Sequence, residues 1–128
     1  MLHVAIWEEP IPWARMRGGH ARWKPEDLRA WQDHVRDVVL QEIALTDAYA
    51  SGPYEDPSVM VLAFATKSKK FDLDNGAKAI LDALKHVLYP DDSKKYIKGL
   101  IVFGTEPHDD QPPVQLWHLP VTVNLPSP

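Results

Sequence analysis

Apolar residues recur along this 128-residue chain with two different periods. Short apolar or alternating runs, rich in Val, Leu and Ile, predict β-strands at residues 2–7, 58–66, 96–106 and 114–125. Apolar residues at helical spacing predict α-helices at 25–45 and from about 75 to 87. The order β-α-β-α-β-β predicts a single α+β domain with two main helices packed on a mixed β-sheet.

Local signals refine this outline. Pro25 suits the first position of the first helix, and Glu26 and Asp27 complement the positive end of its dipole. Trp31 lies on the apolar stripe of that helix and is expected in the core, as is Trp117 of the last strand. Pro120 cannot donate a ladder hydrogen bond, which favours an edge position or a bulge for the last strand.

Composition narrows the class of protein. A chain of this length is one domain on ordinary size priors, and 45% hydrophobic with 25% charged residues is normal for a globular protein. The absence of cysteine excludes a disulfide scaffold, a Cys-based zinc site and a thiol nucleophile. The start, MLHVAIWEEP, has no basic region before its short apolar run, so it reads as a strand and not as a signal peptide.

The charged residues are segregated along the chain. The net charge is −4, yet all 14 Lys and Arg residues fall within 12–36 and 67–98. Segments 37–66 and 99–128 contain acidic residues and no basic ones. Such segregation can build a basic face for phosphate groups on an acidic protein, although two ordinary solvated faces would give the same pattern.

The stretch FDLDNGAKAILDAL, residues 71–84, sets Asp72 and Asp74 two residues apart before a helical pattern. An EF-hand calcium loop that started at Asp72 would need an acid at its fifth position, Gly at its sixth and Glu at its twelfth. The sequence has Gly76, Ala77 and Ala83 there, which excludes a calcium loop. A second interpretation is that Asp74 or the following Asn caps the helix, and this accounts for one acid at most.

The predicted second helix has two contrasting faces. Ala77, Ile80, Leu81, Leu84 and Leu88 form the apolar side, whereas the polar side carries Asn75, Lys78, Asp82 and Lys85. A second acidic pair, Asp91 and Asp92, follows the helix and is expected near its far end, about 20 Å from its start. Carboxylates beside a lysine in basic surroundings suit a hard divalent cation such as Mg²⁺.

The whole motif resembles the RusA family of Holliday junction resolvases, the crossover junction endodeoxyribonucleases of bacteria and their phages. The resemblance is carried by Asp72-Leu73-Asp74-Asn75, by Lys78, by Asp82-Ala83-Leu84 and by the pair Asp91-Asp92. Gly76 departs from the family, which usually has a bulky apolar residue there, and a glycine is expected to loosen the first helical turn.

The resemblance implies a homodimeric endonuclease domain spanning residues 1–128 that depends on Mg²⁺ or Mn²⁺ and cuts four-way DNA junctions by paired symmetric nicks. It implies that Asp72, Asp74 and Asp92 bind the metal, that these three and Lys78 are catalytic, and that Asn75, Asp82 and Asp91 support them. A bacterial or phage-infected cytoplasm is the implied location. How Asp92 reaches the first two acids is not evident from the sequence.

Basic residues near the motif are the candidates for DNA binding. They are Arg15, Arg17, Arg22, Lys24, Lys67, Lys69 and Lys70. Trp23 is a candidate for stacking on an unpaired base or for anchoring its own loop. Two alternatives stay open, namely a nuclease acting on flaps or other branches and a junction-binding protein that does not cut.

Overall fold

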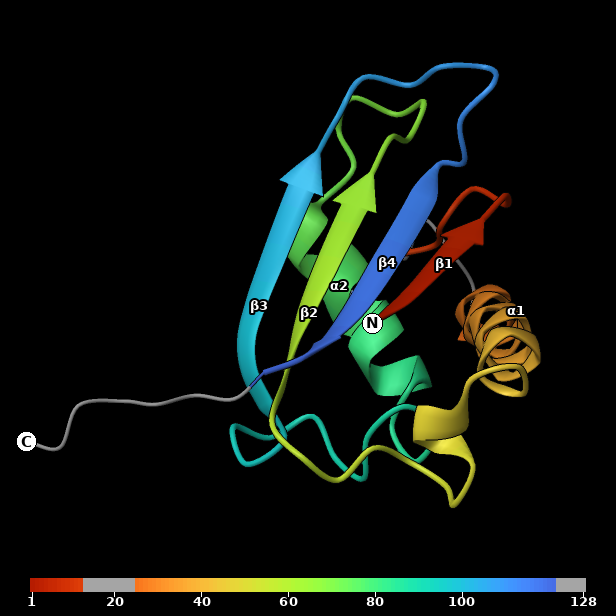
Figure 1. The fold of residues 1–128 in the computed structure, drawn as a ribbon. Coiled ribbons are helices and arrows are strands. Elements are labelled where there is room, and N and C mark those ends of the chain that lie inside the picture. The colour runs from red at the N-terminus through yellow and green to blue at the C-terminus, as the bar shows by residue number, and fades with distance from the viewer. Residues whose placement is uncertain (13–24, 122–128) are drawn as a thin grey trace, which may run out of the picture.

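The computed structural model describes residues 1–12 and 25–121 and contains one four-stranded sheet (Figure 1). Its strands are β1 (Leu2–Ile6), β2 (Ser58–Phe64), β3 (Ile97–Gly104) and β4 (Val114–Pro120). They lie in the order β1-β4-β2-β3. β4 runs antiparallel to both of its neighbours, whereas β2 and β3 are parallel. The predicted mixed sheet is therefore confirmed.

Two helices cover one face of the sheet, as Figure 1 shows. α1 spans Pro25–Ile43 and α2 spans Leu73–Ala83, and a short 3-10 turn, η1 (Asp47–Tyr49), follows α1. The predicted α+β architecture with two main helices is confirmed. None of the helices in the described ranges is long and apolar enough to cross a lipid bilayer.

Buried and more exposed residues alternate along β2 and β4, which distinguishes the core face of the sheet from its surface face. Met60, Leu62 and Phe64 of β2 are fully buried and belong to one core cluster with Val35 of α1 and Ile80 of α2. As far as the described residues go, the opposite face of the sheet is open, and β3 presents Ile101 and Phe103 there, each about half exposed. Trp117 also lies on the open face, stacked on His3 at 4.8 Å between ring centroids, so its expected place in the core is wrong.

The place of β4 in the sheet and the bounds of α2 both differ from the predictions. β4 lies inside the sheet and not at its edge, and Pro120 is tolerated because it is the last residue of the strand. α2 begins two residues before the predicted start and ends four residues before the predicted end. His86, with a φ of 66°, turns the chain away soon after α2.

Side chains of α1 hold the carboxyl-terminal half of α2. Gln32 Nε2 donates to the Ala79 carbonyl oxygen at 3.0 Å, and Arg36 Nε donates to the Ala83 carbonyl oxygen at 3.1 Å. The last carbonyls of a helix have no partners within it, so the Arg36 contact satisfies one that α2 leaves open. Arg36 also pairs with Asp33 at 2.7 Å, and its charge is therefore used within the fold.

Candidate active site

Asp72 caps the amino terminus of α2. Its backbone is extended, and its Oδ1 accepts hydrogen bonds from the backbone N–H groups of Asp74 at 3.0 Å and Asn75 at 3.3 Å. The Asn75 side-chain amide donates to Asp72 Oδ2 at 3.1 Å. The expected cap at Asp74 or Asn75 is therefore wrong, since Asp72 fills that role and α2 starts earlier for the same reason.

Asp74 and Lys78 follow on the exposed side of α2. Asp74 lies in the first turn, and Lys78 comes four residues later, which puts both on the same helix face. Both residues are exposed to solvent. The amino-terminal end of α2 thus presents two carboxylates and one ammonium group to solvent, as the sequence predicts.

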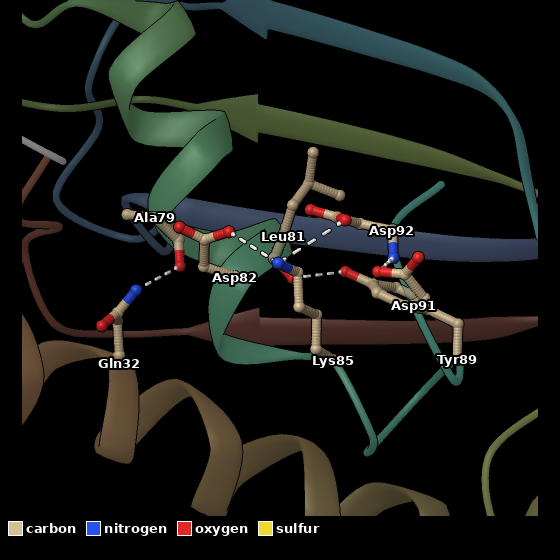
Figure 2. A network of polar contacts seen from close by, with 8 residues as sticks. All are labelled: Gln32, Ala79, Leu81, Asp82, Lys85, Tyr89, Asp91 and Asp92. Atoms are coloured by element: carbon tan, nitrogen blue, oxygen red, sulfur yellow. Dashed lines mark hydrogen bonds and ion pairs between the residues drawn. The ribbon is translucent and has the colours of Figure 1, made fainter. Parts of the chain in front are cut away.

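A second acidic group lies at the carboxyl-terminal end of α2, shown in Figure 2. The Lys85 ammonium lies between Asp82 Oδ1 at 3.5 Å and Asp92 Oδ1 at 3.6 Å. Asp91 Oδ1 accepts a hydrogen bond from the Asp92 backbone N–H at 2.9 Å. Asp92, and to a lesser degree Asp82 and Asp91, raise the pKa of Lys85. We name this group the Lys85 cluster: Asp82, Lys85, Asp91 and Asp92.

Tyr89 fixes the turn that carries this cluster. Its hydroxyl donates to the Leu81 carbonyl oxygen at 2.9 Å, and its ring is fully buried. Burial raises the pKa of the hydroxyl, so Tyr89 stays neutral and keeps its donor proton. Asp91 and Asp92, two and three residues after Tyr89, are thereby tied to the end of α2, and their predicted place at the far end of the helix is confirmed.

The two halves of the expected site lie apart. Asp72 precedes the 11 residues of α2 and Asp92 lies beside its far end, which at 1.5 Å per residue separates them by about 16 Å. Within residues 1–12 and 25–121, no three acidic or histidine side chains lie close enough to hold one metal ion. Carboxylate oxygens are the donors that Mg²⁺ prefers, so the residue types fit the ion although one chain does not bring them together.

The basic candidates fall into two groups. Lys67, Lys69 and Lys70 are exposed on the loop between β2 and α2 and thus lie next to Asp72. The other four (Arg15, Arg17, Arg22 and Lys24) lie outside the described residues, as does Trp23.

The packing around position 76 explains why the residue there is a glycine, and the sequence alone does not reveal this. It is buried in the first turns of α2, and a Cβ atom there would come within 2.5 Å of the Phe71 ring and 3.2 Å of the Phe64 ring. Those two rings pack against each other at 5.0 Å between centroids. Phe71 occupies the space that a larger residue at position 76 would need, and the helix starts normally despite the glycine.

Sequence reasoning also missed the role of Lys85. The helical period put Lys85 on the polar side of α2 but gave it no partner. The signal was available, because Asp82 and Lys85 stand three residues apart on one helix face. Its contact with Asp92 depends on the return of the chain after α2, which local spacing does not determine.

Comparison with known proteins yields one family. The model of the family described as Endodeoxyribonuclease RusA matches residues 9–114, which include both halves of the site. No curated protein matches the chain.

Proposed function

The chain belongs to the RusA family of endodeoxyribonucleases, the Holliday junction resolvases, and from this premise we propose how its residues perform the cut. Asp72, Asp74 and Asp92 hold Mg²⁺ or Mn²⁺, and Lys78 faces the phosphate. The observation that carries this assignment is the exposed group of Asp72, Asp74 and Lys78 at one end of α2, within the matched region.

Each side chain has a separate part in phosphodiester hydrolysis. A bound divalent ion would supply an activated water and would stabilise charge on the leaving oxygen. Asp72 is pre-oriented by the hydrogen bonds to its carboxylate, so little ordering remains when a ligand arrives. The Lys78 ammonium offsets the negative charge that grows on the phosphoryl oxygens. Asn75 supports Asp72 directly through its side-chain amide.

We infer further that the active site is completed across a homodimer. Residue 78 is midway between residues 74 and 82 on α2. A two-fold axis beside Lys78, with the two α2 helices antiparallel, would set Asp74 opposite Asp82 of the partner subunit. Asp72 and Asp74 would then approach the end of the partner helix that carries Asp92 of the partner subunit. The separation of the two halves within one chain supports this arrangement.

A two-fold dimer also suits the substrate. A four-way junction has two-fold symmetry, and a symmetric dimer presents two equivalent sites for paired nicks. Lys67, Lys69 and Lys70, next to Asp72, are placed to contact phosphates, and Arg15, Arg17, Arg22 and Lys24 are assigned the same task. We assign the activity to residues 1–128 as one domain acting in the cytoplasm of a bacterial or phage-infected cell.

A nicking assay tests the reaction. Wild-type protein and Asp74→Asn are incubated with a labelled four-way junction, a flapped duplex and a linear duplex, with Mg²⁺ or Mn²⁺ or with EDTA. We expect paired nicks in the junction only with the metal, and none with Asp74→Asn, which should still bind because one negative charge near phosphate is removed. Binding without nicking in either metal would indicate a junction-binding protein that does not cut. Equal cutting of the flapped duplex would contradict selectivity for four-way junctions.

A further inference from the structure

A pocket of about 500 Å³ opens beside the amino terminus of α2. It lies where the parallel strands β2 and β3 end, because Phe64 and Gly104 are the last residues of those strands, pair in register and both line it. Crevices at the carboxyl ends of parallel strands are common ligand sites.

The pocket is lined by both apolar and polar side chains. The apolar ones are Phe64, Phe71, Leu73 and Pro107, and the polar ones are Thr66, Lys67, Ser68, Lys69, Thr105 and Glu106. Ring and aliphatic surfaces accept the flat face of a base, whereas ammonium groups accept a phosphate. This combination fits one nucleotide better than it fits an apolar molecule or a simple anion.

The charged groups that line the pocket are available to a ligand. Within the described ranges, Lys67, Lys69 and Glu106 take part in no ion pair. Among the residues that the structure describes, Glu106 is the one acidic side chain that lines the pocket, and all three residues are exposed. Because a carboxylate accepts hydrogen bonds but does not donate them, Glu106 favours a ligand with a hydrogen-bond donor, and an exocyclic amino group is such a donor.

The pocket adjoins the proposed catalytic carboxylates. Leu73 lines it and stands between Asp72 and Asp74 in the chain. A smaller hollow of about 190 Å³, lined by the exposed Trp7, shares Lys67 and Pro107 with it. A DNA strand that crosses Lys67 would therefore meet two hollows with aromatic walls.

We propose that this pocket holds one nucleotide of the branched DNA next to the scissile phosphate and selects a base with an exocyclic amino group. The base lies on Phe71 and Leu73, its amino group donates to Glu106, and its phosphate contacts Lys67 and Lys69. This inference rests on the proposed function and adds to it the origin of a preference for certain cleavage sequences.

The test uses four-way junctions in which a single nucleotide near the crossover is made abasic, one position at a time. Wild-type protein should nick one of these junctions at least 10-fold more slowly than the intact junction. A junction with thymine at that same position should be nicked more slowly than a junction with cytosine or adenine there. Binding to the same junctions is measured in EDTA, so the pocket is tested even if no nicking occurs.

Variants separate the pocket from general charge effects. Glu106→Gln is exposed and should fold, and it should lose most of the discrimination against thymine. Phe71→Leu should lose most of the penalty for the abasic position. The matched control is Lys70→Ala, which removes one charge from the same loop but does not line the pocket, and which should weaken binding evenly while keeping the base preference.

The outcomes distinguish the two proposals. Nicking that requires metal but is indifferent to every base near the crossover, with equal binding of all the junctions, overturns the pocket and leaves the nuclease assignment intact. A base preference that Glu106→Gln and Phe71→Leu retain overturns it as well. Binding that depends on one base, without nicking in Mg²⁺ or Mn²⁺, supports the pocket and contradicts the catalytic proposal.

Discussion

The effect of a substitution at Gly76 depends mainly on one neighbour, Phe71, whose ring fills the space beside it. An alanine in a helix interior is favoured over glycine by up to about 1 kcal/mol. The new Cβ would lie 2.5 Å from the ring, and overpacking of this kind costs about 1–3 kcal/mol. The contact with Phe71 should therefore decide the sign of the change.

We predict that Gly76→Ala lowers the free energy of unfolding by about 1 kcal/mol in the wild-type background. In a Phe71→Leu background the same change should be stabilising, because the ring atoms that clash are absent. Urea denaturation of the two single variants and the double variant measures the coupling. An equal loss of stability in both backgrounds would contradict this packing account.

His118 is the second residue whose surroundings decide its behaviour. It is fully buried in β4, its Nδ1 meets the Tyr49 hydroxyl, and its Nε2 has no partner among the described residues. The rings of Tyr49, Tyr54 and Tyr89 surround it. Burial, with a smaller effect of the terminal amine, lowers the pKa of His118 to about 4.

The sign of the pH dependence follows from this shift. The folded pKa lies below the usual value of 6.5, so the stabilising effect is complete above pH 6.5 and is lost as the pH falls toward 4. We expect a loss of about 3 kcal/mol across that window from this residue. His118→Asn keeps an acceptor for Tyr49 and does not titrate, so its unfolding free energy should fall less. If the free energy of unfolding fell equally with pH in the wild type and in His118→Asn, His118 would be excluded as the cause of the loss at acid pH.

At the scale of elements, Asp72 has two tasks that substitutions can separate. It caps α2 and it is a proposed metal ligand. Removing a cap costs about 1 kcal/mol, whereas serine retains the capping oxygen.

We predict that Asp72→Ala loses both nicking and about 1 kcal/mol of stability. Asp72→Ser should lose nicking while its unfolding midpoint stays close to that of the wild type. Thermal melts and a junction nicking assay on the same preparations provide the comparison. Full activity in Asp72→Ser would remove Asp72 from the catalytic set.

The elements themselves could largely be predicted from the sequence, because strand and helix periods are local. All four strands and both helices occur near their predicted places. The ends of α2 were missed, since its start depends on which acid caps it and its end is held by Arg36 and Tyr89 from elsewhere in the chain. The central place of β4 could not be predicted, because periodicity carries no information about which strands pair.

At the scale of the whole molecule, two of the described basic residues are engaged within the fold and do not add to a free basic face. Arg36 is bound to α2 and Asp33, and Lys85 is held between two acids. Lys67, Lys69 and Lys70 remain exposed beside Asp72. The motif predicted that Asp91 and Asp92 lie near the far end of α2, and this place is confirmed. How Asp92 would reach Asp72 and Asp74 could not be predicted from the sequence, because the rigid length of α2 keeps the two groups apart within one chain.

A site shared between two subunits leads to a distinctive prediction. Asp74→Asn and Asp92→Asn homodimers should both be inactive, because every site carries one defect. A mixed dimer joins one Asp74→Asn subunit with one Asp92→Asn subunit. If Asp92 completes the site that holds Asp72 and Asp74 of the other subunit, this dimer has one intact site and one doubly defective site. If Asp92 acts within its own chain, both sites of the mixed dimer carry a defect.

The direct measurement is therefore the nicking of a four-way junction by the mixed dimer. The two variants are co-expressed with different tags, and the mixed dimer is purified through both tags. We expect the mixed dimer to nick one strand of each junction in Mg²⁺, at roughly half the wild-type rate because one of two sites is intact. A mixed dimer as inactive as the two homodimers would contradict a site shared between the subunits.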